Sequence, residues 1–136
     1  MHLTHSRADR ALLVQRLLLS GIIAAHGWAR LLAGGVEPFG VWLDSQGIPL
    51  GMAIAYAITA IEILGTPLLA AGFFVVYLCP VYAAIYVAGI ALVHAPAGWF
   101  VVGLGRNGME YSVLLVCCLL CMAYRYLPVR HGSTST

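Results

Sequence analysis

Charge is scarce in this chain, and lysine is absent. Only 9% of the 136 residues are charged, whereas 62% are apolar, and the mean hydropathy is +0.93. A soluble domain is about one quarter charged, and a disordered chain is polar, so both classes are excluded. Seven arginines against five acids leave a formal charge of +2, which is no nucleic-acid footprint. The composition therefore indicates an integral membrane protein.

Motifs for metal, haem and nucleotide binding are also missing. The chain has no C-x-x-C-H haem motif, no iron–sulfur spacing and no H-x-x-x-H or H-x-x-E-H metal spacing. Gly103-x-Gly105-x-x-Gly108 matches a dinucleotide fingerprint only as a string, because no buried strand of a βαβ unit precedes it. We therefore expect no bound metal, haem or nucleotide.

The cysteines do not indicate redox chemistry of their own. All four lie inside apolar runs, and Cys118 and Cys121 form a C-x-x-C deep in one of them. Thiolate formation is disfavoured in such surroundings, so we interpret the cysteines as small packing residues. The first apolar run starts at Ala11 and is too long for a cleavable signal peptide, so we expect it to be retained as a helix.

Four apolar segments are long enough to cross a bilayer, which requires about 20 residues. They cover residues 11–33, 49–73, 74–93 and 108–127, and the continuous middle pair is expected to fold back at Gly72. Residues 34–48 and 94–107 are predicted to be longer, polar loops. The predicted fold is an all-α, four-helix transmembrane bundle over residues 11–127, with tails at 1–10 and 128–136.

The distribution of arginine predicts the orientation. Most arginines lie in or next to the two tails, whereas the long loops hold only Arg30 and Arg106. The positive-inside rule then places both termini in the cytoplasm and both long loops outside, in a bacterial-type inner membrane. A weak internal echo is also present, since His26-Gly27-Trp28 resembles His94 with Gly98-Trp99. A duplicated helical hairpin is one interpretation of it.

Glu62 is the most informative ionisable residue, because acids at membrane depth usually mark function. Thr59 and Thr66 share its helix face, which indicates a polar stripe directed into the bundle. A buried carboxylate must be neutral or paired, and we expect Arg16 or His26 to be its partner. A buried pair that only fixes helix packing is the alternative.

His26, His94 and Glu110 are expected to converge at the outer ends of their helices. A His–carboxylate set at a water–lipid boundary suits proton transfer, because His titrates near neutral pH. An interfacial hydrogen-bond network is the alternative, and the helix dipole alone could account for Glu110. We predict that His26, Glu62, His94 and Glu110 are catalytic candidates that line one cavity open to the outer side. Arg16 is expected to lie below Glu62.

The loop that leads into the last apolar segment resembles the DoxX family of small four-helix membrane proteins. The resemblance rests on HAPAGWF from His94 and GRNGMEY from Gly105, which follow the family pattern H…GWF…E-Y. Arg16-Leu, His26-Gly27 and a Glu62 ahead of Leu-Leu-x-x-Gly fit the same family. The resemblance covers roughly residues 12 to 125.

The resemblance implies a place in a membrane redox assembly. DoxX-like proteins are named for a subunit of an archaeal thiosulfate:quinone oxidoreductase, and relatives are linked to redox assemblies and thiol stress responses. We therefore expect a quinone-facing subunit with a protein partner. Its candidate substrate-binding residues are Arg16, Trp99, Asn107 and Tyr111. The alternatives are a non-catalytic anchor or assembly subunit, and a small-solute carrier, which would need a homo-oligomer because four helices are few.

Overall fold

The computed structural model describes residues 6–103 and 105–128. Within these ranges every regular element is helical, so the chain is all-α as predicted. The parts of the predicted tails at 1–5 and 129–136 lie outside the described residues. The helices are α1 (Arg7–Leu32), α2 (Val36–Ser45), α3 (Gly51–Ala71), α4 (Val75–Gly89), the π-helical turn η1 (Ile90–His94), α5 (Ala95–Ala97) and α6 (Glu110–Arg125).

The first helix begins at Arg7, four residues before the predicted start. Ser6 caps it: the Ser6 hydroxyl accepts a hydrogen bond from the Asp9 backbone N–H at 3.1 Å. The Asp9 carboxylate in turn accepts from the Ser6 backbone N–H at 3.1 Å. This reciprocal capping box satisfies two donors that a helix start leaves free. The predicted N-terminal tail is therefore helical from Arg7 onward.

Three helices are long and apolar enough to cross a membrane: α1, α3 and the continuous helix Val75–Ala97. The fourth predicted span, α6, has 16 residues. At 1.5 Å per residue it is about 24 Å long, which is short of a bilayer core of about 30 Å. The chain is an integral membrane protein with three candidate spans in the described residues, and the four-span count remains a prediction.

The polar loop predicted over residues 34–48 is wrong, because this segment contains α2. Val36 and Leu43 recur on one face of α2 and pack against Ala55 of α3 as a small apolar cluster. Gly40 allows the close approach, since a Cβ there would lie 2.8 Å from the Met52 Cα. Because this amphipathic helix also carries polar residues, its hydropathy did not indicate a helix.

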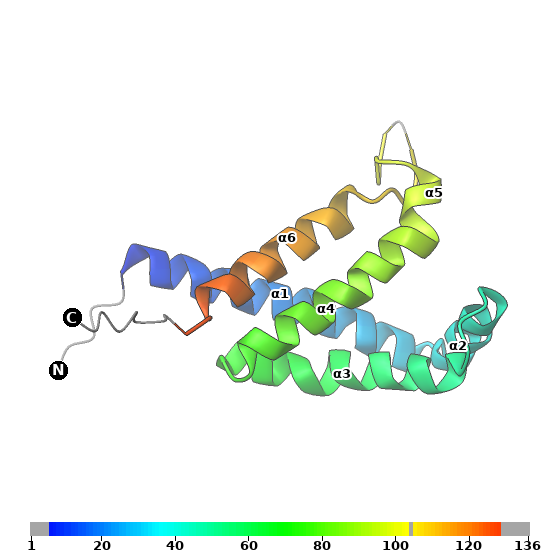
Figure 1. Cartoon of the computed structure of the whole chain (residues 1–136), viewed down its shortest axis with the longest axis horizontal. Coiled ribbons are helices and arrows are strands. Elements are labelled where there is room, and N and C mark those ends of the chain that lie inside the picture. Colours follow the sequence, from blue (N-terminus) through cyan, green and yellow to red (C-terminus); the bar gives the residue numbers. More distant parts are fainter. Residues whose placement is uncertain (1–5, 104, 129–136) are drawn as a thin grey trace, which may run out of the picture.

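The long helices pack as two pairs. The helix α1 lies along α3 and α4 lies along α6, while the two pairs touch each other less. Figure 1 shows the pairs meeting where α1 begins and α6 ends, which we call the closed end, and spreading apart towards α2 and α5, the open end. The Arg125 guanidinium lies 3.4 Å from the Asp9 carboxylate, so the first and last turns share the closed end. This pairing matches the echo in the sequence, although the duplication itself remains a prediction.

The main apolar core lies towards the closed end. Its fully buried side chains include Ile23, Leu69, Tyr82 and Leu119, one from each long helix. The Tyr82 hydroxyl donates a hydrogen bond to the Ile61 carbonyl oxygen at 2.7 Å, which ties α4 to α3 and satisfies the buried hydroxyl. The core therefore joins both helix pairs at this end.

The chain folds back between α3 and α4 at Gly72, as predicted. Gly72 follows the last residue of α3 and has a φ of +88°, a left-handed conformation that glycine adopts without a Cβ clash. A Cβ at this position would also lie 2.8 Å from the Arg16 guanidinium. Gly72 is thus needed both for the reversal and for the space that Arg16 occupies.

Candidate functional site

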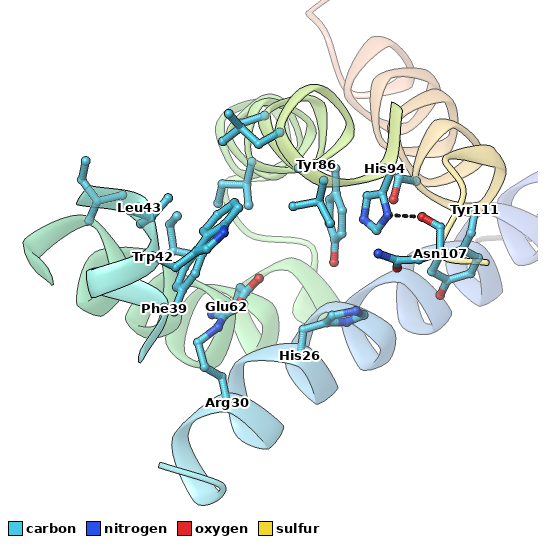
Figure 2. Close-up of a pocket in the computed structure, with 18 of the residues that line it drawn as sticks. His26, Arg30, Phe39, Trp42, Leu43, Glu62, Tyr86, His94, Asn107 and Tyr111 are labelled. Atoms are coloured by element: carbon cyan, nitrogen blue, oxygen red, sulfur yellow. Dashed lines mark hydrogen bonds and ion pairs between the residues drawn. The ribbon is translucent and has the colours of Figure 1, made fainter. Parts of the chain in front are cut away.

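A cavity of about 560 Å³ lies at the open end, between the two helix pairs. This volume is in the range of small-molecule sites, which are mostly apolar with a few convergent polar groups. The lining agrees with that description, because most of its side chains are aliphatic or aromatic. The polar and aromatic lining residues are His26, Arg30, Phe39, Trp42, Glu62, Tyr86, His94, Asn107, Tyr111 and Ser112 (Figure 2).

Glu62 forms an ion pair with Arg30 on the cavity wall. The Arg30 Nη1 donates to the Glu62 Oε2 at 2.6 Å and to the Thr59 hydroxyl at 3.1 Å. The Glu62 side chain is only 3% exposed and that of Arg30 is 20% exposed. Pairing compensates a carboxylate that burial would otherwise destabilise. The predicted partners of Glu62, Arg16 and His26, were wrong.

The reason for this pairing is the close approach of α1 to α3. A Cβ at Gly27 would lie 2.8 Å from the Glu62 Cβ, so only glycine permits this separation of the helices. Arg30 is three residues after Gly27 and lies on the same side of α1. Its long side chain therefore reaches back to Glu62 across the contact.

The helix α2 covers the ion pair with aromatic side chains. The Arg30 guanidinium carbon lies 4.7 Å from the centre of the Phe39 ring, within the range of a cation–π interaction. The Phe39 ring in turn stacks on Trp42, with ring centroids 6.1 Å apart. The cavity therefore has an aromatic wall directly beside a fixed positive charge.

His26 is anchored by its own helix. Its Nδ1 lies 2.9 Å from the Ile22 carbonyl oxygen, and a carbonyl only accepts, so Nδ1 carries the hydrogen. The Nε2 atom remains for proton exchange or for a ligand. The His26 ring meets the Tyr86 ring edge-on, with centroids 6.1 Å apart.

His94 is anchored in the same manner from the opposite helix pair. Its Nδ1 lies 2.8 Å from the Asn107 carbonyl oxygen, the hydrogen bond drawn in Figure 2, so its Nε2 also remains available. His94 ends the π-helical turn η1, and such turns are frequent at functional sites. The two histidines therefore present equivalent ring nitrogens from the two sides of the open end.

Tyr86 provides a buried polar group on the cavity side of α4 that the described residues leave unsatisfied. Figure 2 shows its ring extending from α4 with the hydroxyl directed towards the side of α1 and α3. This hydroxyl is buried and has no hydrogen-bond partner in the described chain. Buried polar groups are nearly always paired, so an unpaired hydroxyl on a cavity wall indicates a place for a ligand atom or a water molecule.

Glu110 and Trp99 are not among the lining residues, contrary to the predicted common cavity. The Glu110 Oε1 accepts a hydrogen bond from the Val101 backbone N–H at 3.0 Å. The Glu110 backbone N–H donates to the Trp99 carbonyl oxygen at 3.1 Å. Both residues therefore close the connection between α5 and α6, which carries Asn107. A catalytic role for Glu110 remains a prediction.

Arg16 lies on the closed-end side of Glu62, the side predicted to be cytoplasmic, but it neither pairs with Glu62 nor lines the cavity. Its guanidinium donates to the Tyr126 hydroxyl and lies beside Gly72. Of the four predicted substrate-binding residues, Asn107 and Tyr111 line the cavity, whereas Arg16 and Trp99 do not. His26, Glu62 and His94 share the cavity as expected, and their chemical roles remain predictions.

Comparison with known families identifies the chain. The DoxX family model matches residues 11–95, which is more than half of the chain. This protein belongs to the DoxX family. The matched residues of this DoxX protein include His26, Arg30, Glu62 and His94, but end before the GWF…E-Y segment of the quoted resemblance. No curated protein and no solved structure matches the chain.

The cysteines of the DoxX chain are free thiols on its helices. Cys79 is buried, Cys118 is half-buried, and Cys117 and Cys121 are exposed on α6. Among residues 6–103 and 105–128, no three His, Cys, Asp or Glu side chains are close enough to share a metal ion. The polar chemistry of the described chain is therefore concentrated at the open-end cavity and around Arg16.

Sequence reasoning missed three polar residues of the cavity, namely Arg30, Tyr86 and Ser112. Arg30 was visible as the basic residue that follows His26-Gly27 in the first helix, but it was counted only with the outer loop in the charge comparison and was not considered as a partner of Glu62. Tyr86 lies in an apolar helix, where a tyrosine looks like packing. Only its spacing of four residues from Tyr82 signalled that two hydroxyls share one helix face.

Proposed function

We propose that this DoxX protein is an inner-membrane subunit of a redox assembly. In this proposal the open-end cavity is a quinone or quinol site that exchanges protons with the outer side of the membrane. The observation that supports it best is the buried, unpartnered Tyr86 hydroxyl on the wall of a mostly apolar cavity of about 560 Å³. A planar ring with oxygen atoms at its edge would fit such a site and complete that hydrogen bond.

The cavity residues match the needs of such a ligand. Trp42 and Phe39 provide flat apolar surface for a ring. The Tyr86 hydroxyl is placed to hold an oxygen atom at the ring edge. A quinone, when bound, supplies reversible uptake of two electrons and two protons.

In this proposal His26 and His94 exchange protons with the bound quinone or quinol. Each has its Nδ1 hydrogen engaged with a backbone carbonyl, which holds the ring in place and leaves Nε2 to take up or release a proton. His26 and His94 come from different helix pairs, so a ligand between the pairs would lie within reach of both. The ion pair of Arg30 with Glu62 would keep the wall polar without taking part in the transfer.

Electron transfer to or from the quinone requires a partner protein. The sequence has no haem or iron–sulfur motif, so in this proposal a second protein delivers or accepts the electrons. The arginine distribution predicts that the open end faces the outer side of the membrane. The partner would therefore contact the loop and α2 surface around the cavity mouth.

Bound quinone can be tested directly. The protein is purified from quinone-containing membranes in mild detergent and extracted with organic solvent, and the ultraviolet spectrum is recorded before and after borohydride. The proposal expects a reducible absorbance near stoichiometric with protein, and a lower content in Tyr86→Phe. A wild-type extract without quinone, together with no quenching of Trp fluorescence by an added short-chain quinone, would overturn it.

Two glycines offer a matched pair of variants for the same test. Gly89 lines the cavity, and a Cβ there would meet no atom within 4 Å, so Gly89→Leu is expected to fill the cavity without a backbone clash. Gly21 is equally unobstructed but is not a lining residue. Quinone content should fall in Gly89→Leu and stay unchanged in Gly21→Leu.

The anchor function is the competing hypothesis, and the Arg30–Glu62 pair favours it because it joins α1 to α3. If the polar residues are purely structural, His26→Gln and His94→Gln will lower thermal stability and leave quinone binding unchanged. If the proposal is right, both variants will remain folded and the pH dependence of quinol oxidation in the assembled complex will shift.

A further inference from the structure

A second, separate pocket lies at the closed end and is lined by arginine. It measures about 390 Å³ and does not share a residue with the open-end cavity. Its polar walls are the side chains of Arg10, Arg16, Arg125, Asp9 and Tyr126, and two leucines of α1 complete it. This pocket plays no part in the proposed quinone function.

The pocket has more positive charge than the described residues compensate. Three arginines face one aspartate, which leaves a formal excess of two positive charges. Among the described residues the pocket has one ion pair, Arg125 with Asp9, which is long at 3.4 Å and exposed, so it contributes little to stability. Neither Arg10 nor Arg16 forms an ion pair with a described residue.

The Arg16 guanidinium is held in position, but the described residues do not use all of its hydrogen-bond donors. Its Nη1 donates to the Tyr126 hydroxyl, and its guanidinium carbon lies 5.7 Å from the centre of the Tyr126 ring. Gly72 leaves just enough room on the other side. The Nε atom is buried and has no hydrogen-bond partner in the described chain. The protein therefore orients this guanidinium while leaving part of its donor capacity unused.

Arg16 lies within a candidate membrane span, so its charge requires a neutralising anion or access to a polar layer. It is nine residues from the start of α1, about 14 Å along a candidate membrane span. Charged side chains at membrane depth are paired or reach an aqueous or headgroup layer. Leu13 and Leu17 of α1 are 43% and 48% exposed, and their spacing of four residues puts them on one side. An apolar track thus leads from the arginines along the helix.

We propose that this closed-end pocket binds the headgroup phosphate of an anionic phospholipid, with Arg16 and Arg10 as the phosphate ligands. Guanidinium groups match phosphate geometry and are weakly hydrated, which favours such pairing near a membrane. The apolar track of Leu13 and Leu17 accommodates the acyl chain, and this favours a lipid over a free phosphate ion. Juxtamembrane arginines are attracted to anionic lipid in general, whereas this pocket predicts a saturable site.

The test measures lipid retention by native mass spectrometry. The full chain is reconstituted in phosphatidylcholine nanodiscs with increasing phosphatidylglycerol, and protein-bound lipid is counted after release. Wild-type protein should retain one phosphatidylglycerol molecule saturably in preference to phosphatidylcholine. Arg10→Gln and Arg16→Gln should each weaken retention about fivefold. Arg106→Gln removes the same charge from the opposite end of the bundle and should leave retention unchanged.

Further variants distinguish a specific lipid site from general electrostatic attraction to anionic lipid. Arg16→Lys keeps the charge but loses the planar fork, so it should weaken retention less than Arg16→Gln but measurably. If Arg16→Gln fails to fold, Arg10→Gln decides, because Arg10 is exposed and forms no ion pair with a described residue. Equal losses in Arg106→Gln and Arg10→Gln, or displacement of the lipid by millimolar inorganic phosphate, would overturn the proposal.

Discussion

The two ends of this bundle differ in whether a buried tyrosine hydroxyl finds a hydrogen-bond partner. At the closed end the buried Tyr82 hydroxyl donates to a backbone carbonyl and the surrounding side chains are fully buried. At the open end the Tyr86 hydroxyl, one turn further along the same helix, has no partner in the described chain and lines a cavity. The same residue type thus contributes to packing at one end and to a candidate binding site at the other.

This difference follows from the divergence of the helix pairs. Where the pairs meet, side chains from all four long helices fill the space between the pairs. The arginine-lined pocket of the closed end lies outside this core, against α1 and the end of α6 alone. Where the pairs separate, their side chains line a cavity, and α2 and the connection after α5 contribute further lining residues. The closed end therefore provides the rigidity that a site at the open end needs.

The largest expected effect comes from breaking the ion pair that spans α1 and α3 beside the cavity. Glu62→Gln leaves the Arg30 charge without its partner and should destabilise the fold by about 3–5 kcal/mol. Unfolding titrations in mixed micelles measure this change in the free energy of unfolding. The double variant Arg30→Met/Glu62→Met should recover much of the loss, and a double variant as unstable as the sum of the single variants would contradict pairing.

Removing packed volume should affect the closed end far more than the open end. Leu119 is fully buried, so Leu119→Ala should cost about 3 kcal/mol, because a cavity is left behind. Leu92 borders the existing cavity, so Leu92→Ala should cost well under half of that. The same micellar titration compares them, and equal costs would show that the open end is as tightly packed as the core.

Helix separation can be tested with two glycines of α1. Gly27→Ala places a methyl group 2.8 Å from the Glu62 Cβ and should destabilise by about 1–3 kcal/mol. Gly21→Ala meets nothing within 4 Å and should be neutral or slightly stabilising, as helix propensity predicts. Thermal unfolding followed by circular dichroism distinguishes the two. A neutral Gly27→Ala would mean that α1 and α3 can separate freely.

The two tyrosines provide the finest comparison. Tyr82→Phe removes a buried hydrogen bond and should cost about 1 kcal/mol. Tyr86→Phe removes a hydroxyl without a partner in the described chain and should cost nothing in ligand-free protein. Both are measured by the same thermal unfolding. A clear loss in ligand-free Tyr86→Phe would indicate a structural hydrogen bond there.

A labelling experiment tests the orientation of the two ends without affecting stability. Glu37 is exposed on α2 at the open end, so Glu37→Cys in a cysteine-free background should react with a membrane-impermeant thiol reagent added from outside. Replacing the four native cysteines should itself leave folding intact, since we interpret them as packing residues. Labelling only after permeabilisation would reverse the predicted topology.

The sequence alone determined the class and the approximate helices. Scarce charge and long apolar runs allow only a membrane-embedded helical chain, because unpaired backbone groups cannot be left in lipid. It also singled out His26, Glu62 and His94, since polar residues within apolar helices stand out against their surroundings. Gly72, followed by an aromatic cluster and Pro80, was identified as the reversal because glycine adopts a left-handed turn without a Cβ clash.

Only the tertiary structure decided which polar groups meet. Arg30 pairs with Glu62 because Gly27 brings two helices into contact, a distance that no spacing along the chain encodes. The helix α2 formed where composition suggested a loop, because its apolar face packs on α3. Glu110 and Arg16 lie outside the cavity because one closes a loop and the other reaches Tyr126, more than a hundred residues away in sequence. Helical period places a side chain on a face, but the packing of separate helices determines its partner.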